Sequence, residues 1–168
     1  MKRWAALLRA VNVGGTGKLP MAELKALCEG LGLEQVQTYI ASGNVVFTSD
    51  RGEAELRDAI GQALLEKYGK QPGVLVRCAG ELEAVVTANP WPDRPGNRVV
   101  AIFVDEPLSL DGVAGQRGEV IALGTRAIYV DYGEGMADSR LRIPCAKAGT
   151  ARNMNTVRKL AEMTAAPS

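Results

Sequence analysis

The sequence predicts an α+β protein built from two ferredoxin-like (βαββαβ) halves, the second degenerate, that ends in a C-terminal helix. Three observations favour this class. The first 78 residues alternate short apolar runs with helical periodicity, in the order strand, helix, hairpin, helix, strand. A segment rich in proline and glycine follows near the middle of the chain. Beyond it, a strand, a short helical stretch and a hairpin repeat the opening order, which indicates a structural duplication without a clear sequence repeat.

The first half opens with a mostly apolar run at 5–11, which is typical of a strand buried on both faces. Pro20 suits the first turn of a helix, and the apolar positions that follow recur at helical spacing until Gly30 and Gly32. Asp50 is a suitable N-cap for a second helix. This half is predicted to continue with a hairpin at 36–47, the second helix at 51–68, a short strand at 74–76 and a short helix at 81–88.

The segment 89–96 holds three prolines and is predicted to be a linker. It would join an N-terminal ferredoxin-like subdomain, 1–88, to a C-terminal α+β subdomain, 97–168. In the second subdomain we expect a strand at 98–104, a helical turn at 110–114 and a hairpin at 119–132. These are followed by a helix at 137–143, stopped by Pro144, and by a final helix that opens with cap chemistry, at 150–163.

Composition removes several classes of protein. The 168 residues include no histidine, so Ser–His and Cys–His catalysis are excluded. Three widely spaced cysteines indicate reduced thiols in a cytoplasmic protein and do not suggest a disulfide framework or a zinc site. No apolar run approaches the ~20 residues of a membrane helix, so we expect no membrane association. Whether the protein is an enzyme stays open at this point.

The charges are unevenly distributed, although the net charge is only +1. Residues 1–22 and 139–161 carry several cations and no acid, which favours an anionic partner. The alternative is that these are solvated faces that never meet. Nucleic acid could bind the basic C-terminal segment, but only eight aromatic residues are present and no RNP-like aromatic strand occurs.

A glycine-rich loop at 12–18 precedes the first predicted helix and suggests a phosphate cradle. The specific motifs are absent. A Walker loop needs glycine where the chain has Asn12, and it needs serine or threonine where the chain has Leu19. The other interpretation is a strand-to-helix turn that needs glycine for its geometry.

Four blocks of the sequence, LLRAVNVGG, LPMAEL, TYIASGNVVF and TARNMNTV, resemble the signature of the bacterial domain-of-unknown-function family 1697, which reads LRGINVGG, PMxxL, TYxxSGNxxF and TxRNWNTV. The chain departs from this pattern at Ala10, Ala41 and Met154, where the family usually has Gly, often Gln and usually Trp. The resemblance implies a two-part α+β fold of ferredoxin-like units. It implies no activity.

From the hydrogen-bond donors in the N-terminal and C-terminal blocks we predict a polar cleft between these two blocks that holds a small anionic or nucleotide-like ligand, with no cofactor and no metal. The predicted ligand-binding residues are Arg9, Asn12, Gly14, Gly15, Lys18, Ser42, Asn44, Arg152, Asn153, Asn155 and Thr156. Helix capping and turn geometry would also explain these residue types. The other functions left open are an assembly module, whose apolar sheet edge pairs with a partner chain, and a histidine-free transferase-like enzyme.

Overall fold

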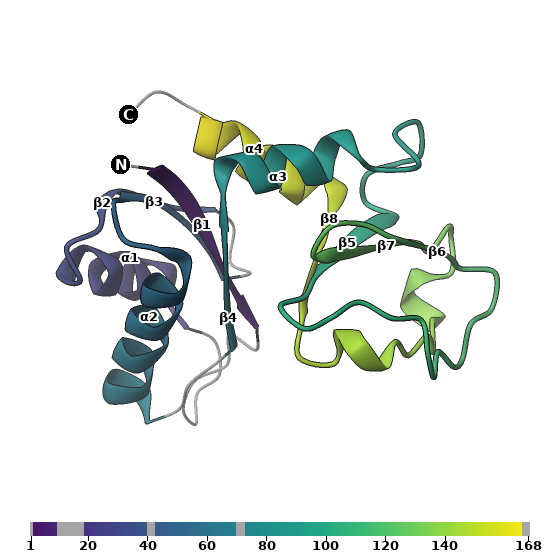
Figure 1. Ribbon diagram of the computed structural model, residues 1–168, viewed down its shortest axis with the longest axis horizontal. Coiled ribbons are helices and arrows are strands. Elements are labelled where there is room, and N and C mark those ends of the chain that lie inside the picture. The colour runs from purple at the N-terminus through teal and green to yellow at the C-terminus, as the bar shows by residue number, and fades with distance from the viewer. Residues whose placement is uncertain (1, 10–18, 40–42, 70–72, 166–168) are drawn as a thin grey trace. The chain divides into compact units, whose positions relative to one another are not determined.

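The computed structural model describes residues 2–9, 19–39, 43–69 and 73–165 (Figure 1). Over these ranges it holds two four-stranded antiparallel sheets and four α-helices, so the predicted α+β class is confirmed. The chain divides into two compact units: Met1–Glu81 with Leu160–Ser168 (unit 1), and Leu82–Lys159 (unit 2). None of the helices in these ranges is long and apolar enough to cross a membrane.

Unit 1 has the predicted order of strand, helix, two strands, helix and strand. Its elements are β1 (Lys2–Arg9), α1 (Met21–Gly30), β2 (Glu34–Tyr39), β3 (Asn44–Ser49), α2 (Glu53–Tyr68) and β4 (Gly73–Cys78). The strand order is β2-β3-β1-β4, and all neighbours are antiparallel. β1 therefore lies inside the sheet, as its apolar sequence predicts.

One face of this sheet carries the helices and the core of unit 1 (Figure 1). Leu56, Ile60 and Leu64 follow each other at four-residue spacing on α2 and are completely buried. Gly69 ends α2 with φ 74°, a left-handed conformation that glycine adopts without strain. The N-cap of α2 is Gly52, so the cap predicted at Asp50 is wrong.

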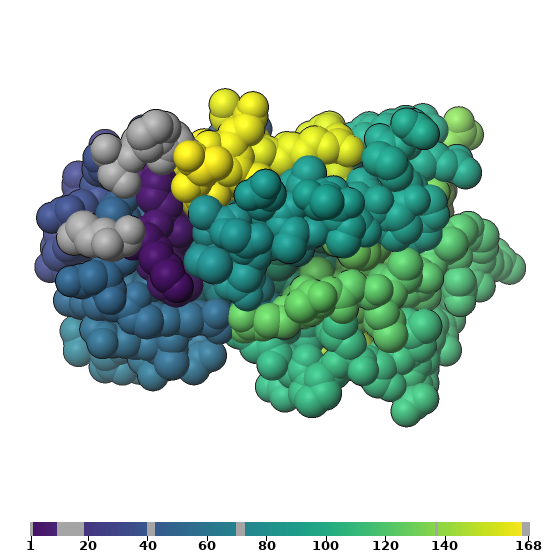
Figure 2. All heavy atoms as spheres, turned by 45° about the horizontal axis from the view of Figure 1, so that its top comes forward, coloured from purple at the N-terminus to yellow at the C-terminus, as the bar shows by residue number. Residues whose placement is uncertain are grey.

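Unit 2 contains the second sheet, with strand order β6-β7-β5-β8. Its strands are β5 (Val99–Phe103), β6 (Val120–Leu123), β7 (Ala127–Asp131) and β8 (Thr150–Asn153). Two helices, α3 (Ala79–Thr87) and α4 (Met154–Ala165), each cross the boundary between the units, and they lie side by side (Figures 1 and 2). The hydroxyl group of Tyr129 on β7 donates a hydrogen bond to Val85 O of α3 at 2.6 Å, so α3 covers this face of the sheet.

The opposite face of the second sheet carries an apolar cluster built around Val104, Ile128, Val130 and Ile143. Ile143 comes from the segment after β7, which turns back over the sheet before β8 begins. The long connections 104–119 and 132–149 therefore belong to the core of unit 2 and contribute to its packing.

Two predicted helices of the second half are wrong, and so is the role predicted for Pro144. Residues 110–114 form no helix; instead Ala114 pairs with Arg142 in an isolated bridge. The helix expected at 137–143 is reduced to a 3-10 turn at Met136–Asp138, because the bridge holds the following residues extended. Pro144 does not stop a helix but opens a second 3-10 turn, Pro144–Ala146.

The start of the C-terminal helix also differs from the prediction. Thr150–Asn153 pairs with β5 as strand β8, and α4 begins only at Met154. The cap chemistry expected near Thr150 is found at Asn153, whose side-chain oxygen accepts a hydrogen bond from Thr156 N at 3.0 Å. The predicted linker 89–96 lies in unit 2, where Gly96 O accepts a hydrogen bond from Met154 N at 3.0 Å.

Candidate functional site

The predicted residues of the N-terminal block are only partly described by the structure. Outside the described ranges lie Asn12, Gly14, Gly15, Lys18 and Ser42. Arg9 is exposed at the end of β1, opposite Gly73 of β4. Asn44 is completely buried, and its side-chain amide donates to Tyr39 O at 3.2 Å, across the hairpin that joins β2 to β3. This contact gives Asn44 a role in closing the hairpin.

Arg152 is a buried cation on the edge strand β8, and only 8% of it is exposed. Its guanidinium Nη1 donates to Thr150 Oγ1 at 2.6 Å and to Ala151 O at 2.9 Å. Burial lowers the pKa of Arg152 to about 10, so the side chain still carries its charge at neutral pH. These contacts of β8 hold the guanidinium in a fixed position, which a cation that binds an anion also needs.

The other predicted residues of the C-terminal block join the start of α4 to the loop before β5. Asn153 caps the helix by accepting from Thr156 N. Gly96 lies so close to α4 that a Cβ atom there would be 2.8 Å from Asn155 Cγ and 2.9 Å from Arg158 Nη1. Met154 is completely buried at the position where the family signature has tryptophan. Capping and packing therefore account for Asn153 and Asn155 without a ligand.

A pocket of about 230 Å³ lies on the face of the second sheet that α3 does not cover. Strands β5 and β8 contribute to one side of it, and the segment 141–149 contributes to the other. Its lining consists of Ile102, Tyr132, Leu141, Ile143, Ala146, Gly149 and Ala151. Side chains alternate along a strand, so Arg152, next to Ala151, lies on the opposite face of the sheet. The pocket and the buried guanidinium are thus separate features of unit 2.

The polar group of the pocket lining is the phenol of Tyr132. Burial, and secondarily the charge of Glu119, raises the pKa of Tyr132 above its usual value, so the hydroxyl group stays protonated and can donate a hydrogen bond. Hydrogen bonds from the Ser139 hydroxyl group and, next, from Arg117 N lower the pKa of Glu119. The Glu119 carboxylate is therefore charged at neutral pH and already bound by neighbouring donors.

The cysteines differ in their surroundings. Burial raises the pKa of the Cys28 thiol to about 12, which makes it unreactive. Cys145 is half-buried, and its sulfur donates to Ser109 O at 3.0 Å and accepts from Ser109 N at 3.4 Å. These hydrogen bonds tie the connection after β5 to the 3-10 turn that holds Cys145, which gives the thiol a structural role.

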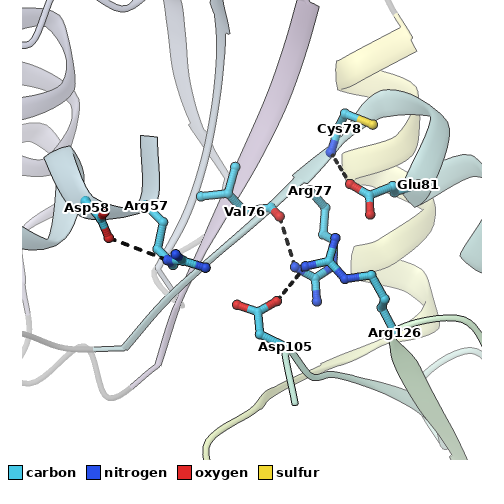
Figure 3. Close-up of polar contacts among 8 residues, drawn as sticks. All are labelled: Arg57, Asp58, Val76, Arg77, Cys78, Glu81, Asp105 and Arg126. Carbon is cyan, nitrogen blue, oxygen red and sulfur yellow. Dashed lines mark hydrogen bonds and ion pairs between the residues drawn. The ribbon is translucent and has the colours of Figure 1, made fainter. Parts of the chain in front are cut away.

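The carboxylates at the strand ends are engaged by arginines. Asp105 forms an ion pair with Arg126 at 2.8 Å (Figure 3). Asp131 lies 3.6 Å from the Nε atom of Arg94 and also accepts a hydrogen bond from Gly133 N at 3.0 Å. In the ranges that the structure covers, no group of three or more Asp, Glu or Cys residues is placed to hold a metal ion.

Sequence reasoning missed two features. Arg77 is 1% exposed, and its guanidinium donates to Val76 O at 2.9 Å (Figure 3). A charge directly after the apolar run of β4 was the available signal. The pocket lining had no such signal, since its residues lie between 102 and 151 and converge only when the connections fold back over the sheet.

Comparisons with other proteins bear on the whole chain. A sequence model of a family described as "Protein of unknown function (DUF1697)" matches residues 1–129. Among solved structures, the chain is similar to a conserved bacterial protein from Streptococcus pneumoniae, with a TM-score of 0.79, 28% sequence identity and 98% of each chain covered. No curated protein matches the sequence. Neither description names an activity, and the block at 150–157 lies beyond the residues matched to the family.

Proposed function

Because the chain belongs to the DUF1697 family of proteins of unknown function, we propose a function from its own geometry: it binds a small ligand with an anionic group in the pocket of unit 2. The observation that carries the proposal is an aliphatic pocket with one phenol donor, bordered by a segment whose charges, which lie outside the lining itself, are all positive. The segment 139–149, which supplies Leu141, Ile143 and Ala146 to the lining, carries three cations and no acid.

The lining suits a ligand with an apolar body and one polar end. Ile102, Leu141 and Ile143 offer aliphatic surface, and the neutral phenol of Tyr132 offers a hydrogen-bond donor. Lys147 directly follows the lining residue Ala146 and is exposed, and the proposal assigns its flexible ammonium group the contact with the anionic end of the ligand. Together these groups favour a small carboxylate or phosphate ester.

The volume limits the size of the ligand. Pockets for drug-sized molecules usually measure ~300–1,000 Å³, and this pocket measures about 230 Å³. A complete nucleotide would therefore extend into solvent, and only its sugar phosphate or its base could enter. The proposal accordingly narrows the nucleotide-like ligand predicted from the sequence to a smaller anion.

The test is a thermal-shift screen of the full chain with inorganic phosphate, small carboxylates, phosphate esters, nucleotides and a short RNA. A ligand at 100 times its dissociation constant stabilises the native state by ~2.7 kcal/mol, which corresponds to a rise in Tm of roughly 5–11 °C for a chain of this length. Ala151→Phe fills the pocket and should abolish the shift. Ala148→Phe adds the same ring at an exposed position that does not line the pocket and should keep the shift.

A second pair of variants tests the charge. Lys147→Ala should weaken binding, while Lys159→Ala removes another exposed cation, on α4, and should not. A shift that Ala151→Phe leaves unchanged would reject the pocket. If Arg152→Ala alone removes that shift, the ligand binds at the predicted C-terminal block, which is the second site we propose for the anion. A shift with RNA only would favour a nucleic-acid partner instead.

We also propose that unit 1 is a ferredoxin-like unit and unit 2 a degenerate copy of it. The element order βαββαβ and the strand order β2-β3-β1-β4 of unit 1 support this. In unit 2 the strand order β6-β7-β5-β8 is analogous, but no α-helix lies between β5 and β6.

A further inference from the structure

Strand β6 forms one edge of the sheet of unit 2 (Figure 1). Its sequence is Val-Ile-Ala-Leu, without a charge or a proline. Val120 and Leu123 are 49% and 48% exposed, the highest values among the exposed large apolar side chains of the described ranges. Edge strands of soluble proteins usually carry a charge, a proline or a bulge that prevents pairing with another chain. β6 has none of these devices, so it can accept a further strand.

The hairpin geometry shows which backbone groups face the open edge. Gly124 N donates to Ala127 O at 2.8 Å, so these two residues form a hydrogen-bonded pair. Such pairs alternate along an antiparallel ladder, and therefore Ala122 also directs its backbone groups toward β7. Ile121 and Leu123 direct their N–H and C=O groups outward. Within the described part of the chain, β6 pairs with β7 and with no other strand.

The open stretch ends before Glu119. The next outward-facing residue is Glu119, but its backbone oxygen already accepts a hydrogen bond from Gln116 Nε2 at 2.6 Å. Its carboxylate is bound by Arg117 N and the Ser139 hydroxyl group. The free hydrogen-bonding groups of the edge are therefore those of Ile121 and Leu123, with Ala122 at the centre.

We propose that β6 pairs antiparallel with β6 of a second copy of this chain, around a twofold axis at Ala122. In this register Ile121 lies opposite the partner subunit's Leu123, and Leu123 lies opposite the partner subunit's Ile121. In both pairs the backbone N–H and C=O groups of the two residues face each other, so each pair forms two hydrogen bonds and four form across the axis. The two sheets become one continuous sheet of eight strands.

The side chains are self-complementary in the same register. Residues opposite each other in an antiparallel pair lie on the same face of the sheet. Ile121 already packs against the apolar cluster of Ile128 and Val130, and Leu123 shares that face two residues further along. Pairing brings Leu123 against the partner's Ile121, so the apolar cluster continues across the axis. No like charges are opposed, because the strand carries none.

A register centred on Ile121 is disfavoured, since it would place Glu119 opposite the partner's Leu123, and the backbone oxygen of Glu119 is already bound. The contact is short, so we expect a weak dimer whose population rises with concentration. This inference does not depend on the ligand pocket.

Cysteine cross-linking tests the register directly. Ala122 faces its own symmetry mate in a non-hydrogen-bonded pair, where Cα atoms lie ~4.5 Å apart, within the range that a disulfide spans. Ala122→Cys should therefore form a covalent dimer under mild oxidation. Val120→Cys is the matched control: its mate lies four residues along the strand, roughly 13 Å away, too far for a disulfide. Both variants retain the native Cys78 and Cys145, so any cross-link through these thiols would occur in the control as well.

Sedimentation of the full chain over a range of concentrations gives the independent readout. The wild type should shift toward a dimer as concentration rises, and Leu123→Lys should abolish the shift. Leu110→Lys, at a position with 43% exposure outside β6, should leave the shift intact. A monomer at every concentration, or equal cross-linking of Ala122→Cys and Val120→Cys, would overturn the proposal. A dimer that Leu123→Lys does not disturb would also overturn it.

Discussion

At the scale of single residues, Tyr68 joins the end of α2 to the first turn of α1. Its hydroxyl group donates to Glu23 Oε1 at 2.5 Å, and Lys67 lies 3.5 Å from the same oxygen. Burial, followed by the hydrogen bond and charge of Glu23, raises the pKa of Tyr68 to about 12. The hydrogen bond from Tyr68 is in turn the largest factor that lowers the pKa of Glu23.

These shifts predict how Tyr68→Phe changes the pH dependence of stability. A raised tyrosine pKa stabilises the folded state below the ordinary value of 10.0, and this contribution is lost as pH rises toward about 12. A lowered glutamate pKa stabilises it above 4.5, and this contribution is lost as pH falls through the folded value. The difference in Tm between wild type and Tyr68→Phe should therefore be largest between roughly pH 5 and 10 and shrink at both ends. A difference that stays constant from acid to alkaline pH would contradict the shared hydrogen bond.

Arg152 gives a second prediction at this scale. Its burial costs solvation, which the hydrogen bonds to Thr150 and Ala151 offset. Arg152→Ala should lower the free energy of unfolding by about 2–4 kcal/mol, because it leaves a cavity and unpaired polar groups. Arg152→Met fills the space without a buried charge and should cost less than half as much. Urea unfolding of both variants measures this; equal losses would show that the charge itself is required.

At the scale of elements, the loop before β5 packs closely against the start of α4, with Gly96 next to Asn155. Gly96→Ala should cost about 1–3 kcal/mol, because the new Cβ atom would lie 2.8 Å from Asn155 Cγ. Removing the obstructing side chain as well, in Gly96→Ala with Asn155→Ala, should recover most of the loss, with a coupling of roughly 1 kcal/mol or more. Gly80→Ala is the matched control, because no heavy atom lies within 4 Å of its Cβ position and it sits in α3. Additive losses in the double variant would mean that the two side chains do not compete for the same space.

A comparison of α2 with β8 shows which secondary-structure elements the sequence can predict and which it cannot. Periodicity predicted both helices of unit 1, because Leu56, Ile60 and Leu64 mark the buried face of α2 without reference to the rest of the fold. β8 carries no comparable signal. Its sequence, Thr-Ala-Arg-Asn, is a strand only because β5 offers an edge for it to pair with. Asn153 could be recognised as a cap residue, but its exact place at the strand–helix junction depends on that pairing.

At the scale of the whole molecule, the difference between local sequence signals and tertiary pairing explains why one candidate site was predictable from the sequence and the other was not. Arg152 was predictable because a recognisable block contains it, whereas the pocket joins residues as distant as Ile102 and Ala151. Their neighbourhood follows from the pairing of β5 with β8 and from the path of the segment between Leu141 and Gly149. No local pattern of charge or hydropathy in the sequence predicts how this segment folds back over the sheet. A tertiary pocket of this kind becomes visible only once the sheet order is known.

The division of the chain into units leads to a prediction about its C-terminus. Residues 160–168 belong to unit 1, although the strands of that unit end at Cys78. The contact that secures them is the Arg3 side chain of β1, whose Nε atom donates to Met163 O at 3.0 Å. Leu160 and Thr164 are buried as well. Truncation after Lys159 should therefore weaken β1, at the opposite end of the sequence.

Hydrogen exchange can measure this effect strand by strand. In the truncated chain, the amides of β1 and β3 should lose protection, because removing Leu160 and Thr164 uncovers apolar surface next to Arg3. Protection in β7, which belongs to unit 2, should change less. Removal of residues 166–168 alone retains Met163 and Thr164, so protection in β1 should stay at the wild-type level. If both truncations left β1 equally protected, the end of α4 would not be part of the folding unit that β1 belongs to.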